Sequence, residues 1–130
     1  MTDMKKGLHH VALTAADLQK TIDFYTRAFG FTVIRRWGDE KPAAMLDMGD
    51  GTILEIFSGG DTAVDDLGKW LHIAVAAEDT DAVYQAALEA GAVSHMAPTD
   101  IVIEADNALP ARIAFVRGVN SELIEIFCEK

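Results

Sequence analysis

The chain contains two segments that each occur twice, and this internal repeat limits the folds that it can adopt. His10–Asp17 (HVALTAAD) returns as His72–Asp79 (HIAVAAED), and Ile53–Phe57 (ILEIF) returns as Leu123–Phe127 (LIEIF). Each copy therefore has a His near its start and a Glu near its end. Because self-similar segments indicate repeated structural units, the chain is expected to consist of two copies of one small fold.

The spacing of apolar residues predicts one strand, one helix and three further strands in each copy. In the first copy the helix begins after Asp17, a capping residue, and ends at Gly30. Asp79 and Gly91 occupy the corresponding positions in the second copy. The predicted strands cover residues 8–14, 31–37, 43–48 and 52–57, and then 70–76, 101–103, 112–117 and 122–127.

The remaining segments are expected to connect these elements. Residues 58–69, with two glycines and scattered Asp, indicate a linker between the copies, and Asp106-Asn107 indicates a turn. Residues 93–104 are predicted to be irregular because Pro98 interrupts them. The predicted fold class is α+β, with two paired βαβββ repeats at about 8–57 and 70–127 in a single domain that spans residues 1–130.

Composition narrows the kind of partner. The chain has 130 residues, half of them hydrophobic, and a formal net charge of −10. This acidity argues against binding to nucleic acid or to an anionic membrane, and favours a small-molecule partner. The sequence shows neither a long apolar segment nor a secretory signal, so we expect a cytoplasmic protein.

The repeated His and Glu residues are candidate metal ligands. His10, Glu55, His72 and Glu125 supply two imidazoles and two carboxylates, which suit one divalent ion such as Ni, Zn, Co, Mn or Fe. Strand alternation places each Glu between apolar residues on its own face, with more apolar residues on the opposite face. A carboxylate there loses several kcal/mol of solvation unless a cation or hydrogen-bond donors compensate.

Other conspicuous residues are expected to have no such role. His9 should point away from His10 by strand alternation, and His95 is expected to be a surface or loop residue. Trp37 and Trp70 are predicted to belong to the core. The single cysteine, Cys128, is expected to contribute to packing.

The first copy resembles a known family. His10–Phe31 has the pattern His-Val-Ala-Leu-x-x-x-Asp-Leu-x-x-x-Ile-x-Phe-Tyr-x-x-x-Phe-Gly-Phe, which is similar to the entry segment of the vicinal oxygen chelate superfamily, the group of glyoxalases, bleomycin-resistance proteins and dioxygenases. The resemblance extends to both Glu segments. It implies a curved, partly closed mixed sheet with a metal between two halves. It also implies a homodimer in which His10 and Glu55 meet His72 and Glu125 of the partner chain.

Within this superfamily the His-Glu-His-Glu set is most similar to glyoxalase I. That resemblance implies a metal-dependent lyase or isomerase that transfers a proton through a metal-stabilised enediolate on a small oxygenated substrate. Glu125 or Glu55 would serve as the general base when displaced from the metal. Two alternatives stay open: an isomerase similar to methylmalonyl-CoA epimerase, and a metal-free protein of the bleomycin-resistance type that sequesters a ligand.

The substrate is not defined by the resemblance. Glyoxalase I usually has an Arg four residues after the first ligand and an Asn four residues after the second, and both hold glutathione. Thr14 and Gly59 stand at these positions here. Each replacement removes a polar side chain that is long enough to hold glutathione, which argues against glutathione adducts as substrates.

Overall fold

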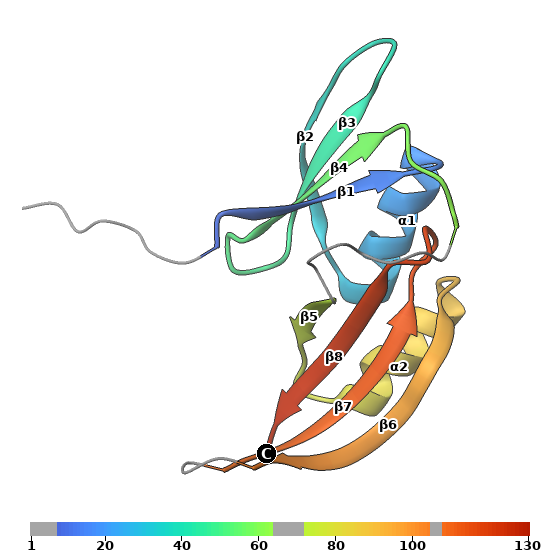
Figure 1. Ribbon diagram of the computed structural model, residues 1–130. Coiled ribbons are helices and arrows are strands. Elements are labelled where there is room, and N and C mark those ends of the chain that lie inside the picture. The colour runs from blue at the N-terminus through green and yellow to red at the C-terminus, as the bar shows by residue number, and fades with distance from the viewer. Residues whose placement is uncertain (1–7, 64–71, 105–107) are drawn as a thin grey trace, which may run out of the picture.

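The first repeat forms a four-stranded mixed sheet with one helix against it (Figure 1). The computed structural model describes residues 8–63, 72–104 and 108–130. The elements of the first repeat are β1 (His10–Ala15), α1 (Leu18–Phe29), β2 (Thr32–Trp37), β3 (Ala43–Asp47) and β4 (Ile53–Ser58). The strand order is β1-β4-β3-β2, with β1 parallel to β4 and the other pairs antiparallel.

The second repeat has the same plan. Its elements are β5 (Ile73–Ala76), α2 (Thr80–Glu89), β6 (Val93–Ile103), β7 (Leu109–Arg117) and β8 (Leu123–Glu129). The strand order β5-β8-β7-β6 repeats that of the first sheet, again with a parallel first pair. The α+β fold with two βαβββ repeats is therefore confirmed. Among the described residues the eight strands form two separate four-stranded sheets, which do not close on one another.

Local sequence signals explain where the helices begin and end. The Asp17 carboxylate accepts a hydrogen bond from the Lys20 backbone N–H, and Asp79 accepts the equivalent bond from Ala82. These bonds satisfy donors that the first helical turn leaves unpaired. At the other end of α1, Gly30 adopts a left-handed conformation with φ 73°, which a side chain would disfavour.

Pro98 does not break the second sheet, contrary to the prediction. β6 runs through it from Val93 to Ile103, with irregular register against β7 between Ser94 and Thr99. β6 lies at the edge of its sheet and pairs with β7 alone. An edge strand tolerates Pro because the missing N–H can fall on the unpaired side or in a bulge.

The helix-facing sides of the two sheets share one hydrophobic core. Side chains of β4 and β8 such as Leu54, Ile56, Ile124 and Ile126 are buried together with aromatic residues of α1. Figure 1 shows the two repeats one above the other, with α1 and α2 in contact. The opposite face of each sheet carries no helix of the described chain.

A loop between β7 and β8 joins the two repeats through polar contacts. The buried Asn120 side chain accepts a hydrogen bond from the Ala16 N–H at 2.8 Å and donates one to the Thr21 hydroxyl at 2.9 Å. The Tyr25 hydroxyl of α1 donates to the Glu122 carboxylate at 2.7 Å. This loop therefore fixes the second repeat against the end of β1 and the start of α1.

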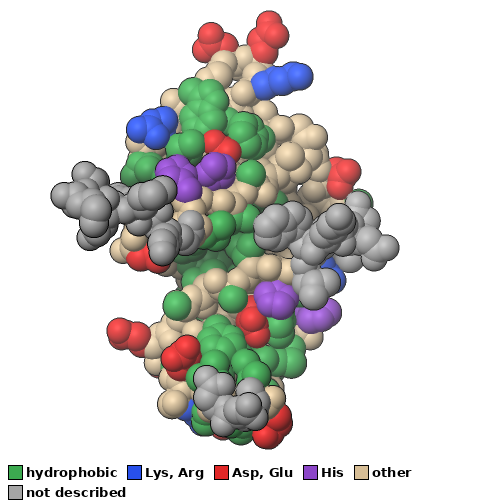
Figure 2. All heavy atoms as spheres, turned by 60° about the vertical axis from the view of Figure 1, so that its left-hand side comes forward, with side chains coloured by type: hydrophobic (Ala, Val, Ile, Leu, Met, Phe, Trp, Pro, Cys, Tyr) green, Lys and Arg blue, Asp and Glu red, His purple; other side chains and the backbone are tan. Residues whose placement is uncertain are grey.

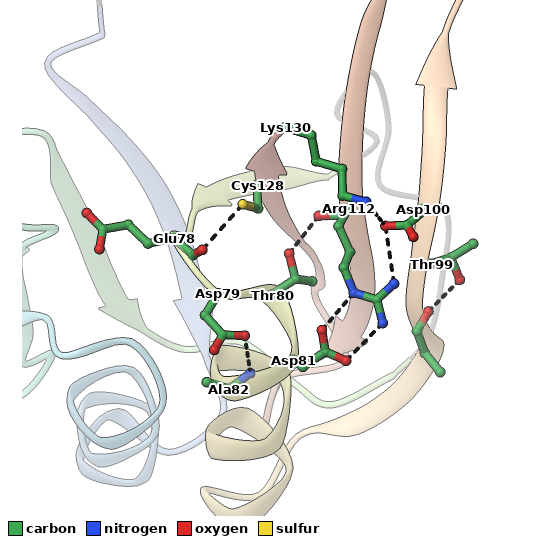
Figure 3. Close-up of polar contacts among 11 residues, drawn as sticks. Glu78, Asp79, Thr80, Asp81, Ala82, Thr99, Asp100, Arg112, Cys128 and Lys130 are labelled. Atoms are coloured by element: carbon green, nitrogen blue, oxygen red, sulfur yellow. Dashed lines mark hydrogen bonds and ion pairs between the residues drawn. The ribbon is translucent and has the colours of Figure 1, made fainter.

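A group of charged residues attaches α2 to its sheet (Figure 3). Arg112 on β7 makes a bidentate contact with Asp81 of α2, at 2.7 and 3.0 Å, and an ion pair with Asp100 of β6 at 3.2 Å. The Arg112 guanidinium lowers the pKa of Asp81, and Lys130 with Arg112 lowers that of Asp100. The Thr80 hydroxyl adds a hydrogen bond to the Arg112 carbonyl oxygen at 2.7 Å.

Candidate functional site

The first candidate pair lies on the open face of the first sheet, the side away from α1. His10 Nε2 on β1 is 3.7 Å from Glu55 Oε1 on β4. The parallel register pairs Ala12 with Glu55, so residues 10, 12 and 14 share the face of residues 53, 55 and 57. The alternating exposure of β1 agrees with this assignment, because His10, Ala12 and Thr14 are exposed while Ala15 is buried.

His9 does not point away from His10, contrary to the prediction. It precedes β1, so strand alternation does not govern its side chain. Its Nδ1 lies 2.9 Å from His10 Nδ1, and the two rings meet edge to face. A hydrogen bond between these nitrogens leaves His10 Nε2 as the atom that faces Glu55, which is the arrangement typical of an oriented metal ligand.

The second candidate pair repeats the first on the open face of the second sheet. His72 Nε2 is 3.2 Å from Glu125 Oε1 on β8. The His72 ring also contacts the Phe115 ring edge to face, with a centroid distance of 5.3 Å. His95 is exposed on strand β6, in agreement with the surface position expected for it, and its ring centroid is 6.3 Å from that of Phe115.

Both carboxylates are shielded from water without a full set of partners. The side chains of Glu55 and Glu125 are 13% and 12% exposed. Among the residues that the structure describes, neither carboxylate accepts a hydrogen bond, and the neighbouring imidazole is the only basic side chain within 4.0 Å. A shielded carboxylate with so little compensation is expected to attract a cation.

The donor geometry of each pair fits two ligands of one divalent ion. Two donors at about 2.1 Å from an ion are about 3.0 Å apart at a right angle and about 3.4 Å apart at a tetrahedral angle. The 3.2 Å separation of the second pair falls between these values, and the 3.7 Å separation of the first requires a small side-chain rotation.

The four predicted ligands do not gather at one point within the described chain. His10 meets Glu55 and His72 meets Glu125, but no group of three or more His, Cys, Asp or Glu residues suited to an ion occurs in residues 8–63, 72–104 and 108–130. Figure 2 shows histidine side chains in two separate groups, each beside an acidic side chain, on one side of the molecule. Each repeat thus carries half of the expected ligand set.

Aromatic side chains flank the first pair. Trp37 is 39% exposed, so the prediction that it belongs to the core is wrong. It lies at the end of β2, an edge strand, and its ring meets that of Phe57 edge to face with a centroid distance of 6.2 Å. Trp70 lies outside the described residues. Beside the second pair, a hollow of about 580 Å³ is lined by residues that include Ala74, Phe127 and Cys128.

Comparison with known proteins identifies the family. Residues 7–107 match the model of the Glyoxalase/Bleomycin resistance protein/Dioxygenase superfamily. The chain therefore belongs to this superfamily. A search of curated proteins gave no significant match. None of the helices in the described part of the chain has the length and apolar character needed to cross a membrane.

Solved structures show the same fold at low sequence identity. A glyoxalase/bleomycin resistance/dioxygenase domain from Frankia sp. EAN1pec is 21% identical with a TM-score of 0.78, over 98% of this chain and 100% of that one. The fosfomycin resistance protein FosX from Listeria monocytogenes, complexed with Mn(II) and sulfate, is 20% identical with a TM-score of 0.73, over 98% and 95%. The glyoxalase I of Leishmania major is 22% identical with a TM-score of 0.71, over 95% and 87%.

Sequence reasoning missed three residues that line these open faces. Strand alternation predicts the wrong direction for the His9 side chain, and Phe115 has no distinguishing sequence signal. Arg35 on β2 was not singled out, although its guanidinium lies 3.5 Å from the Met45 sulfur on the same face as Glu55. Strand alternation could have indicated Arg35, because it is two residues from Trp37 in the same strand and therefore shares its face.

Proposed function

We propose that this protein is a metal-dependent enzyme of the glyoxalase I kind, a lyase or isomerase that moves a proton on a small oxygenated substrate. The observation that carries the proposal is the repeated His–Glu pair. In each repeat a shielded carboxylate lies 3.2 to 3.7 Å from an imidazole nitrogen on an open sheet face. Mixed nitrogen and oxygen donors of this kind suit Ni, Zn, Co, Mn or Fe.

We propose that two chains combine to complete the site. His10 and Glu55 of one protomer would then face the partner's His72 and Glu125 in a homodimer. Two facts about the described residues support this arrangement: each repeat holds only half of the proposed ligand set there, and the open face of each sheet carries no helix from that part of the chain. A symmetric dimer would contain two equivalent sites.

The side chains of the pairs have separate tasks in the proposed reaction. A bound divalent ion would act as a Lewis acid that stabilises negative charge on a substrate oxygen. The carboxylate of Glu125 would accept the proton from the carbon beside the carbonyl and return it to the neighbouring carbon, with Glu55 as the equivalent group of the first repeat. His10 and His72 would stay as neutral ligands, and His9 would hold the His10 ring in place.

Metal analysis tests the ligand assignment. Wild-type protein purified without chelators is expected to contain about one divalent ion per chain, and His72→Ala is expected to lose it because half of one ligand pair disappears. His95→Ala is the matched control, since it removes a histidine from the same open face but outside the ligand set. Wild-type stoichiometry and affinity in His72→Ala would show that this ligand is misassigned.

The role of Glu125 is tested by its amide variant. Glu125→Gln keeps the size of the side chain but cannot accept the proton, so solvent-deuterium exchange into a bound substrate analogue is expected to fall roughly 10²–10⁴-fold. Metal content is measured in parallel, because a weaker ligand also lowers occupancy. If exchange in the metal-reloaded variant equals that of wild type, Glu125 is not the base.

Two other functions are separated by the same measurements. A metal-free ligand-sequestering protein of the bleomycin-resistance type predicts no stoichiometric metal in the wild type. An isomerase similar to methylmalonyl-CoA epimerase predicts the same metal content and the same exchange. It is separated from a lyase by screening carbonyl substrates.

A further inference from the structure

The geometry points to Arg35 as an anchor for the anionic end of the substrate. We infer that the site takes a flat apolar molecule with a carboxylate, held between Arg35 and the aromatic pair Trp37 and Phe57. This inference rests on the proposed function, because it assigns the substrate to the open face of the first sheet. It adds a substrate class that the four-ligand set does not define.

Register places the anchor in line with the candidate ligand. Arg35 pairs with Met45 on β3, and Met45 pairs with Glu55 on β4, so the three side chains form one row across the open face. The guanidinium reaches over Met45, with Nη1 3.5 Å from its sulfur. Since neighbouring strands are about 4.8 Å apart, the backbones at Arg35 and Glu55 are separated by about 10 Å. Because the guanidinium lies over Met45, a ligand carboxylate bound to it lies closer to Glu55 than this backbone separation.

The next row supplies the apolar surface. Trp37 pairs with Ala43, which pairs with Phe57, and the two aromatic rings are 39% and 38% exposed. Ala43 is buried beneath them and the two rings meet edge to face, so together they form one exposed apolar surface against which a planar ligand can pack. Figure 2 shows hydrophobic side chains near a basic one on the histidine-bearing side of the first repeat.

Charge favours an anionic ligand at Arg35. Within the described chain its guanidinium has no carboxylate within 4.0 Å, whereas Arg112 contacts both Asp81 and Asp100. The position that usually carries an Arg in glyoxalase I is Thr14, in the row of Phe57 and Trp37. In this chain the cationic side chain is Arg35, which lies on the outermost strand, one row away from Thr14. We expect an anchor at that place to bind a shorter acid than a glutathione adduct.

Binding of trans-cinnamate tests the inference. This planar aromatic carboxylate is compared with trans-cinnamamide, which has the same shape without the charge. Calorimetric titration of the wild-type protein is expected to show tighter binding of cinnamate by roughly tenfold or more, the effect of one charge-assisted hydrogen bond. In Arg35→Gln the two ligands are expected to bind equally, and Trp37→Leu should weaken both by a similar factor.

Arg36→Gln is the matched control. Arg36 is the next residue on β2, and its guanidinium donates to Gln19 of α1 on the opposite side of the sheet. This variant is expected to keep the preference for cinnamate. Absence of any preference in the wild type, or a full preference in Arg35→Gln, would overturn the inference.

Repeating the titration after metal removal separates this inference from the proposed function. Arg35 and the aromatic pair are not metal ligands, so the ratio of the two affinities is expected to persist without metal. If the metal assignment fails while the cinnamate preference depends on Arg35, the proposed function alone is wrong. If metal binds at the His–Glu pairs while the preference is missing, only the anchor is wrong.

Discussion

At the scale of single residues, Tyr25 shows how a buried polar atom can join the two repeats. Its side chain is fully buried, and its hydroxyl donates to Glu122 of the second repeat at 2.7 Å. Burial raises the Tyr25 pKa well above 10.0, and the charge of Glu122 and the hydrogen bond to it raise the pKa further. The phenol therefore stays protonated in the folded protein at pH values where it would ionise in an unfolded chain.

This shift predicts how stability depends on alkaline pH. Because the folded-state pKa is raised, the contribution of Tyr25 is complete below the unfolded-state value of about 10 and is lost as the pH rises through the folded-state pKa. Denaturant titrations of the wild type between about pH 9 and 11.5 are expected to show a falling free energy of unfolding. Tyr25→Phe removes this proton and should reduce the slope. Equal slopes in the two proteins would contradict the assignment.

The two His–Glu pairs of the candidate site could be predicted because the repeat marks each of them. Glu55 and Glu125 also occupy apolar surroundings in their strands, which alternation alone indicates. The environment of His9 and Trp37 could not be predicted in the same way. His9 lies just before β1 begins, and Trp37 lies on an edge strand, where one face of an apolar side chain has no neighbour.

At the scale of elements, the loop between β7 and β8 has a larger role than its length suggests. Its Asn120 side chain bridges the Ala16 N–H and the Thr21 hydroxyl, both in the first repeat. The amide therefore links the end of β1 to α1. Local sequence patterns do not predict such a role for a loop, because its hydrogen-bond partners are distant in the sequence.

Asn120→Ala is expected to lower the free energy of unfolding by about 1–3 kcal/mol, because it leaves a partly buried N–H without an acceptor. Ser121→Ala is the control. The Ser121 hydroxyl bonds the Thr62 carbonyl at an exposed position, so its loss should cost about 1 kcal/mol or less. Denaturant unfolding measures both changes. If Ser121→Ala lowers the free energy of unfolding more than Asn120→Ala does, Asn120 is not the side chain that links the repeats.

Most element boundaries follow from capping and periodicity, and the exceptions have physical causes. Asp17, Gly30 and Asp79 act at the helix ends as expected. The path of β6 through Pro98 could not be predicted, since local sequence does not say whether a strand lies at a sheet edge. The predicted linker and the turn at Asp106-Asn107 fall partly or wholly outside the described residues.

At the scale of the whole molecule, the two half-sites raise the question of which halves combine. The repeat predicts two equivalent ligand pairs, but the sequence cannot state whether they join within one chain or across two. The chain itself keeps the pairs on separate sheets. Assembly therefore decides whether the proposed site can form.

Mixing two defective chains tests the shared-site arrangement. His10→Ala damages the first repeat and His72→Ala damages the second, so neither homodimer should bind metal fully. After unfolding and joint refolding in equal amounts, each heterodimer regains one complete site, and the mixture should bind about one quarter of the wild-type metal. Sedimentation should show dimers at micromolar concentration. A mixture that binds no more metal than the separate variants would exclude a shared site.

The separation of the two His–Glu pairs has a consequence for behaviour on dilution. If each ion needs ligands from two chains, metal binding and subunit association are thermodynamically linked, and each strengthens the other by the same factor. The apparent affinity for the ion then falls as the protein becomes scarcer. At low abundance the ion would be released by mass action alone, so the fraction of loaded sites would report the concentration of the chain.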